Sequence, residues 1–307
     1  MGAKKNSSEE LISKIKEMKI KAGTAIGKTV VEILRLKVNE FRGDNSLLLI
    51  KELKSTGKRI ISIKPSMAPV ANVVDRILNL SEDLLEKEAS ISEIKQKMNL
   101  WAERYFKVSE NALKNISIYG SKLLSSSSVI FTHSYSESVF EIFKRVKSLQ
   151  KKFRVICTES RPLLEGREFA INLSNLDIET NLITDALIAS FIRQADIVLV
   201  GCDAIYIDGS IINKAGTLLV SILAHKFDIP LYVAAESSKI YPFSSYGMLL
   251  PLEERPEKEV LGDLRIPKDI PLKVTNQFFE LIPHHYIRGF ITENGIYHPG
   301  AIRSLLK

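Results

Sequence analysis

The sequence predicts an α/β fold in which a helical N-terminal domain (residues 1–119) precedes a Rossmann-like, doubly wound parallel sheet domain (residues 120–307). Apolar residues recur at helical spacing through the first hundred or so positions. From about residue 120, short apolar runs alternate with helical segments. Because such alternation arises from right-handed βαβ crossovers, it indicates a mostly parallel sheet.

The helices of the first domain are predicted from the spacing of their apolar residues. These residues are Leu11, Ile15 and Met18, then Ile26, Val30, Ile33 and Leu34, then Leu84, Leu85, Ile91, Ile94, Met98 and Trp101. One run in this domain, Arg59–Ile63, predicts a short strand instead.

The second domain alternates predicted strands with predicted helices. Strands are expected at residues 129–131, 153–156, 178–183, 197–200 and 230–233, with another at 290–292; helices are expected at 137–149, 186–194 and 218–227. Asp208–Gly209 is typical of a two-residue hairpin turn. Residues 241–271, with five prolines and many charges, predict a long surface excursion, and a C-terminal helix is expected to close the fold.

Composition is that of a soluble globular protein, with 45% hydrophobic and 26% charged residues among 307. The net charge of +7 favours small anionic ligands and does not require nucleic acid. Two cysteines form neither a disulfide framework nor a zinc pattern. No apolar run approaches the roughly 18 residues that cross a bilayer, and no signal-peptide core is visible. We therefore expect a cytoplasmic protein.

Two nucleotide-binding motifs are excluded by their spacing. Residues 22–29 look like a P-loop, but only three residues separate the two glycines, where the motif needs four. The run also follows a helical segment instead of a strand. No G-x-G-x-x-G run follows any predicted strand, which argues against a dinucleotide dehydrogenase.

The run after the strand at residues 197–200 predicts a ligand site. Gly201 allows a turn, so that Asp203 lies near the carboxyl edge of the sheet, where open α/β folds bind ligands. Residues 212–217 are expected to open a helix, which brings Asn213, Lys214 and free backbone N–H groups to this edge. A carboxylate beside a cationic helix N-terminus suits a phosphorylated polyol. The alternative, that Asp203 and Thr217 merely cap local turns, remains open.

Three other predicted strands also end in polar residues. His133 and Ser134 follow the first strand; the histidine is either a ligand contact or a packed core residue, and Ser136 is expected to cap the next helix. Arg161 follows the next strand with a planar fork suited to phosphate. Lys239 follows another as a possible phosphate contact. Four such strand ends at one edge favour a shared pocket.

The residue runs at these strand ends resemble those of one known protein family. It comprises the alpha, beta and delta subunits of translation initiation factor 2B, methylthioribose-1-phosphate isomerase and the archaeal ribose-1,5-bisphosphate isomerases. The matching runs are residues 132–136, 158–162, 165–166, 200–204, 208–217, 235–239 and 291–295, with weaker matches at 20–23 and 64–66. Chain length and the run at 132–136 look closest to the alpha subunit and its archaeal relatives.

The resemblance implies a catalytic pair with one member altered. In the isomerase branch the pair is a cysteine and an aspartate, which fall at Ser134 and Asp203 here. A serine hydroxyl ionises far above a thiol of pKa about 8.5, so it needs an adjacent base. His133 is a poor candidate, because neighbouring side chains at an extended strand end point in opposite directions.

The resemblance also implies a phosphate- and sugar-binding set. Near the N-terminus it implies Lys21 and Lys64, in place of the family's arginines, with Ala22 and Gly23. The other contacts are Arg161, Lys214 and Lys239 for phosphate, Asp203 and Asn213 for sugar hydroxyls, and His133 for substrate or phosphate. No metal or redox cofactor is needed for this chemistry, and no metal-ligand spacing is present.

Two functions follow from the resemblance. The leading hypothesis is an initiation factor 2B alpha-subunit-like homo-oligomer that binds a phosphorylated sugar or nucleotide and contacts initiation factor 2 subunits. The alternative is an aldose–ketose isomerase of the ribose-1,5-bisphosphate type. In that enzyme Asp203 would move protons among O1, C1 and O2 of the sugar.

Overall fold

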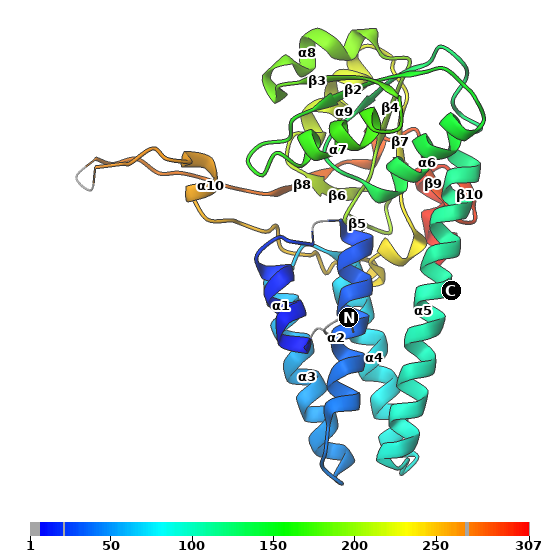
Figure 1. Ribbon diagram of the computed structural model, residues 1–307, viewed down its shortest axis with the longest axis vertical. Coiled ribbons are helices and arrows are strands. Elements are labelled where there is room, and N and C mark those ends of the chain that lie inside the picture. The colour runs from blue at the N-terminus through cyan, green and yellow to red at the C-terminus, as the bar shows by residue number, and fades with distance from the viewer. Residues whose placement is uncertain (1–6, 21, 268–269, 307) are drawn as a thin grey trace. The chain divides into compact units, whose positions relative to one another are not determined.

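A computed structural model describes residues 7–20, 22–267 and 270–306. It divides into two compact units, Met1–Asn111 and Ala112–Lys307. The division falls within the long helix α5 (Ile91–Gly120), whereas the boundary predicted after residue 119 lies at the C-terminal end of that helix. Figure 1 shows the helical unit in blue and cyan and the α/β unit in green to red.

The first unit contains the predicted helices. They are α1 (Ser8–Lys16), α2 (Gly23–Glu40), α3 (Ser46–Ile63), α4 (Ala68–Glu86) and the first part of α5. Ser7 and Asn45 accept backbone hydrogen bonds at the N-termini of α1 and α3 and so define where these helices begin. The core is apolar, with Ile26, Val30 and Leu34 of α2 fully buried.

The prediction of a strand at Arg59–Ile63 is wrong, because these residues form the C-terminal end of α3. The buried residues of α3 include Leu49, Leu53 and Ile60, which recur at helical spacing. The three isoleucines favour a strand locally, but the longer helical periodicity decides the structure.

The second unit contains a seven-stranded sheet. Its strands lie in the order β10-β9-β7-β4-β1-β2-β3. Their bounds are β1 (Val129–Thr132), β2 (Arg154–Thr158), β3 (Glu179–Ile183), β4 (Ile197–Val200), β7 (Leu231–Ala234), β9 (Gly289–Thr292) and β10 (Gly295–Tyr297). All neighbours pair in parallel except β10 with β9. The predicted doubly wound, mostly parallel sheet is thus confirmed.

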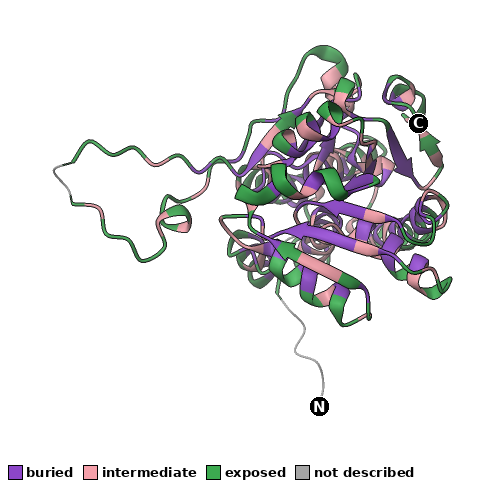
Figure 2. Ribbon diagram, turned by 90° about the horizontal axis from the view of Figure 1, so that it is seen from above, coloured by how far each residue is buried: buried purple, intermediate pink, exposed green. Residues whose placement is uncertain are grey.

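Alternate residues of the central strands form two separate cores, one on each face of the sheet. Val198 and Val200 of β4 lie in one cluster with Val220 of α9 (Thr217–Lys226). Ile197 and Leu199 lie in the other, which includes residues of α6 (Glu137–Ser148) and α7 (Glu165–Ser174). Both faces are covered, so the strands are apolar throughout, and they appear purple in Figure 2.

A smaller antiparallel sheet carries two of the predicted site residues. Its order is β5 (Ala204–Ile205), β6 (Ile211–Lys214) and β8 (Phe279–Ile282). Gly209, with φ of +84°, lies in the turn between β5 and β6, which confirms the hairpin. The loop is longer than the expected two residues, because the Tyr206 N–H donates to the Ser210 carbonyl oxygen across it. Asn213 and Lys214 lie on β6, and α9 begins only at Thr217. The expectation that residues 212–217 open a helix is therefore wrong for Asn213 and Lys214.

Shorter elements complete the unit. They are η1 (Asp185–Leu187), α8 (Ile188–Phe191), η2 (Ile192–Gln194), η3 (Ser237–Lys239), η4 (Pro242–Tyr246), α10 (Lys258–Leu261), η5 (His284–Tyr286) and η6 (Pro299–Leu305). The predicted C-terminal helix is the 3₁₀ helix η6. The predicted excursion is an arm that carries α10, shown in orange in Figure 1. No helix in the described ranges is long and apolar enough to cross a membrane.

Candidate functional site

The order of the main sheet reverses between β1 and β4. From β1 the chain proceeds through β2 to β3 on one side, and from β4 through β7 to β9 on the other. In open α/β sheets, ligands bind beyond the carboxyl ends of the strands at such a reversal. Ser134 follows β1 and Asp203 follows β4, so the topology brings both predicted catalytic residues to this position.

His133 is held by two hydrogen bonds inside the protein. The residue is 2% exposed, with Nδ1 2.6 Å from Thr158 Oγ1 and Nε2 2.9 Å from the carbonyl oxygen of Ala215. Because a carbonyl can only accept, Nε2 carries the proton. Burial lowers the pKa of His133, so the neutral ring accepts the Thr158 hydroxyl proton at Nδ1.

This hydrogen bonding continues from His133 to the backbone of Ser134. Thr158 Oγ1 lies 3.1 Å from Ser160 Oγ, which accepts the Ser134 backbone N–H at 2.9 Å. The network fixes the loop after β1 against the loop after β2. Gly216 belongs to the same arrangement, because a Cβ there would lie 2.7 Å from the His133 ring.

Ser134 has a left-handed backbone, with φ of +66°, and this overturns the assumption of an extended strand end. His133 still does not serve Ser134 as a base, since both of its ring nitrogens contact other groups. Ser160 and Leu164 are left-handed as well, at +62° and +59°. Non-glycine residues in this region are costly and cluster at functional sites.

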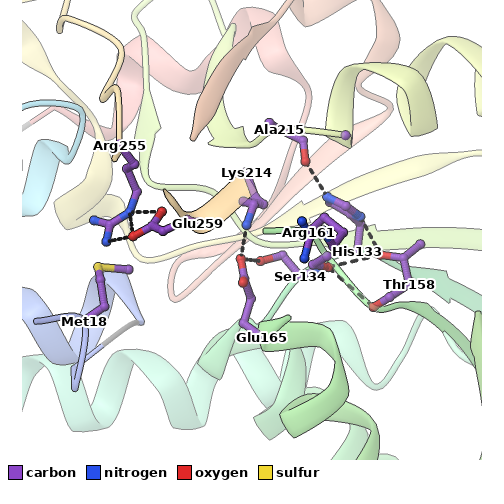
Figure 3. Close-up of polar contacts among 12 residues, drawn as sticks. Met18, His133, Ser134, Thr158, Arg161, Glu165, Lys214, Ala215, Arg255 and Glu259 are labelled. Carbon is purple, nitrogen blue, oxygen red and sulfur yellow. Dashed lines mark hydrogen bonds and ion pairs between the residues drawn. The ribbon is translucent and has the colours of Figure 1, made fainter. Parts of the chain in front are cut away.

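The hydroxyl of Ser134 donates instead to a carboxylate. Its Oγ lies 3.2 Å from Glu165 Oε1, which also accepts from Lys214 Nζ at 2.5 Å (Figure 3). The side chains of Lys214 and Glu165 are 2% and 8% exposed. Glu165 is the first residue of α7, where the helix dipole favours a negative charge.

Gly166 allows this close packing, since a Cβ there would lie 1.8 Å from the Thr158 carbonyl oxygen. Only a residue without a side chain lets the first turn of α7 approach the end of β2. The position of Glu165 is therefore fixed by the backbone beside it.

Lys214 is a desolvated cation with two partners. Burial lowers the pKa of its ammonium, while the Glu165 carboxylate opposes that shift. The ammonium also lies 4.0 Å from the centroid of the Phe278 ring. The pair places a buried ammonium and a buried carboxylate beside the loops that follow β1 and β2.

Arg161 lies on the exposed part of the loop after β2. Its backbone N–H and that of Ser160 donate to the carboxylate of Asp185, at 2.7 and 2.9 Å. Its guanidinium donates to the carbonyl oxygen of Val260 in α10, at 2.9 Å. Asp185 thus orients the arginine loop, a role that the sequence analysis did not assign.

The other predicted residues of this unit are positioned by the backbone around them. Asp203 is partly buried, and its N–H donates to the Ile212 carbonyl oxygen. Asn213 Nδ2 lies 3.1 Å from Thr217 Oγ1. Lys239 is 4% exposed and donates to the carbonyl oxygen of Cys202. Lys239 therefore approaches the segment just before Asp203.

Two of the backbone N–H groups at the N-terminus of α9 already donate to a carboxylate of this chain. Gly216 and Leu218 donate to Glu280 Oε1, at 2.8 and 2.5 Å. Burial raises the pKa of the Glu280 carboxyl group, against the effect of these two hydrogen bonds. The expectation of free N–H groups is therefore wrong for Gly216 and Leu218, because a carboxylate from β8 takes the position of an anion there.

The N-terminal predicted residues belong to the helical unit. Lys21 lies outside the described residues. Ala22 is the N-cap of α2 and Gly23 its first residue. Lys64 is 1% exposed, and its ammonium lies 2.8 Å from Met18 Sδ. Ligand contact by these residues stays a prediction.

The sequence analysis noted Glu165 as part of a matching run but gave it no role. The signal that could have found it is the unusual Glu-Gly pair at a helix start, directly after a loop rich in polar residues. Its pairing with Lys214, 49 positions away, has no local signature. Ser136 caps α6 through Val139 N, as expected.

Comparison with known proteins shows which family the chain belongs to. The model of the "Initiation factor 2 subunit family" matches residues 19–299. The chain belongs to this family. It is 35% identical to a putative translation initiation factor eIF-2B subunit 2-like protein of Pyrococcus abyssi, over 94% of this chain and 96% of the relative.

The family relatives include enzymes. The chain is 30% identical to a ribose 1,5-bisphosphate isomerase of Methanocaldococcus jannaschii, over 95% of this chain and 91% of the isomerase. The crystal structure of a translation initiation factor eIF-2B from Pyrococcus horikoshii matches with a TM-score of 0.80 and 31% identity, covering 95% and 97% of the two chains. The predicted family and fold are confirmed.

Proposed function

We propose that this family member binds a phosphorylated sugar or nucleotide at the β1–β4 reversal of its α/β unit. The observation that carries the proposal is the buried Glu165–Lys214 pair, with the Ser134 hydroxyl on the same carboxylate oxygen. A desolvated ion pair is costly to build, and its position at the strand ends supports a ligand site.

The roles of the contacts follow from their chemistry. Arg161 supplies an exposed planar fork for phosphate, and Lys214 and Lys239 add positive charge. Asp203 and Asn213 hold sugar hydroxyls. His133 and Asp185 fix the two loops that carry Ser134 and Arg161.

Calorimetry with ribose 1,5-bisphosphate, ribose 5-phosphate, AMP and inorganic phosphate tests this proposal. We expect at least one phosphorylated sugar or nucleotide to bind more tightly than phosphate alone. Arg161→Gln should weaken that binding about tenfold or more, the worth of one charge-assisted hydrogen bond. The matched control is Arg167→Gln, on the same segment and paired with Glu159. Absence of binding, or equal losses in both variants, would contradict the proposal.

The biological role proposed for this binding is in translation initiation, as part of a homo-oligomeric, initiation factor 2B-like protein. The name of the Pyrococcus abyssi relative supports this role. Light scattering tests the oligomer, and reconstitution with purified initiation factor 2 subunits tests the partner. A monomer that binds none of these subunits would contradict it.

One observation favours the isomerase as a second candidate. Glu165 supplies the carboxylate neighbour that a serine hydroxyl needs for proton transfer, at 3.2 Å. Conversion of ribose 1,5-bisphosphate to ribulose 1,5-bisphosphate at about 1 s⁻¹ or faster, lost in Asp203→Asn, would establish the enzyme. Activity that appears only in Ser134→Cys would instead indicate a binding protein without its catalyst.

A further inference from the structure

The carboxylate of Glu165 is satisfied on one side only. Oε1 accepts from both Lys214 and Ser134, whereas Oε2 is buried and has no hydrogen-bond partner among the described residues. The whole residue is 6% exposed. Each oxygen of a carboxylate can accept about two hydrogen bonds, so Oε2 has capacity for a donor from outside the chain.

A buried acceptor without a donor is unfavourable, because it loses its hydrogen bonds with water and gains none in return. The residues around Glu165 do not let it turn away. Leu164 before it is left-handed, and Gly166 after it packs against the Thr158 carbonyl oxygen. Its Oε1 is held between the ammonium of Lys214 and the hydroxyl of Ser134.

The charge on Glu165 restricts which group can approach Oε2. A phosphate dianion would be repelled by the carboxylate, whereas a hydroxyl group can donate to it. Arg161, an exposed residue, is proposed above to contact phosphate. The two residues therefore suit the two ends of one ligand, a phosphate group and a hydroxylated carbon chain.

We infer that Glu165 is a specificity residue of the proposed ligand site: its Oε2 accepts a hydrogen bond from a sugar hydroxyl, so that the site selects a polyol phosphate over its deoxy analogue. This inference rests on the proposed function and names the substrate class. A site that bonds a ligand hydroxyl rejects the analogue without it, because the buried acceptor is then left unpaired.

The test is calorimetric binding of ribose 5-phosphate against its 2-deoxy analogue, its 3-deoxy analogue and 1,4-anhydroribitol 5-phosphate, which lacks the first hydroxyl. The wild type should bind at least one analogue about 10- to 100-fold more weakly than ribose 5-phosphate, as for a hydrogen bond to a charged acceptor. Glu165→Gln places an amide donor at the carboxylate and should reduce that difference to about threefold or less. Glu159→Gln, which alters an exposed ion pair on the same segment, should keep it.

Inorganic phosphate separates recognition from general damage. Glu165→Gln removes a negative charge beside Lys214, so phosphate should bind at least as tightly as in the wild type. A variant that is simply misfolded would lose phosphate binding as well. If Glu165→Gln does not fold, the double variant Glu165→Leu/Lys214→Met removes both charges together. It should bind ribose 5-phosphate more weakly, because Lys214 is a proposed phosphate contact, and should discriminate against the analogues by about threefold or less.

Two failures are distinguishable. If ribose 5-phosphate does not bind the wild type at all, the proposed function is contradicted. If it binds but no analogue is discriminated, or if Glu165→Gln keeps the discrimination, the inference on Glu165 is overturned while the proposed function stands.

Discussion

The α/β unit contains a buried ion pair, which contrasts with exposed ion pairs of the helical unit. In the first unit, ion pairs such as Glu9 with Arg59 lie at the surface, with both side chains 54% exposed. In the second unit, the Glu165–Lys214 pair is almost completely buried. Surface pairs contribute little, whereas buried ones are costly to build and costly to break. This contrast supports the proposal that places the ligand site in the α/β unit.

The largest effect should come from Gly166→Ala. A Cβ at this position would lie 1.8 Å from the Thr158 backbone oxygen, and a backbone atom cannot move aside as a side chain can. We expect a loss of more than about 4 kcal/mol of unfolding free energy, measured by urea denaturation. The counterpart in the helical unit is Gly57→Ala, whose Cβ meets the Val74 side chain and should cost far less. Equal losses would remove this contrast.

Lys214→Met should rank next. It leaves the Glu165 carboxylate buried without its cation, which costs about 3–5 kcal/mol. The double variant Lys214→Met/Glu165→Leu should recover most of that loss, because no uncompensated charge remains. A double variant as unstable as the single one would show that the pair is not the cause.

A smaller effect should appear in the pH dependence of stability. Burial lowers the pKa of His133 below its ordinary value of 6.5, so the unfolded chain takes up a proton at this residue more readily than the folded one. The contribution of the neutral ring to folding stability is therefore fully present above pH 6.5 and is lost as pH falls toward the lowered pKa. The loss amounts to at most about 1.4 kcal/mol for each pH unit in this range. His133→Gln should flatten the dependence of the melting temperature on pH between 7.5 and 5.5.

The control for His133 is His284→Gln, an exposed histidine of the same unit. It should leave the pH dependence as in the wild type. If both variants flatten the curve equally, burial of His133 is not its source.

The smallest effect should come from Arg59→Gln in the helical unit. Its exposed pair with Glu9 contributes about 0.2–1 kcal/mol, and that contribution should shrink further in 1 M salt. A loss comparable to that of Lys214→Met would overturn the comparison between the two units.

Much of the fold could be predicted because its signals are local. Strand β4 occupies the predicted residues 197–200, since a short apolar run bounded by turn residues needs no distant partner to be recognised. The error at Arg59–Ile63 arose where two local signals, β-branched residues and helical spacing, disagreed. The placement of Lys214 at a helix start was wrong because β6 is defined by its pairing with β8, far along the chain.

The candidate site was predictable only in part, for the same reason. The residues that follow β1, β2 and β4 could be named because strand ends meet at one edge. The partners of those residues could not, since Glu165 meets Lys214 and Glu280 meets the start of α9 only after folding. The unexpected groups are carboxylates contributed by other segments.

The backbone of Ser134 has a consequence for directed evolution of this protein. Glycine and asparagine adopt a left-handed conformation more readily than serine, so a library screened for thermal stability alone should accumulate them at position 134. The selected variants would lose the hydroxyl that donates to Glu165. Heat tolerance and ligand recognition would then be selected in opposite directions at this single codon.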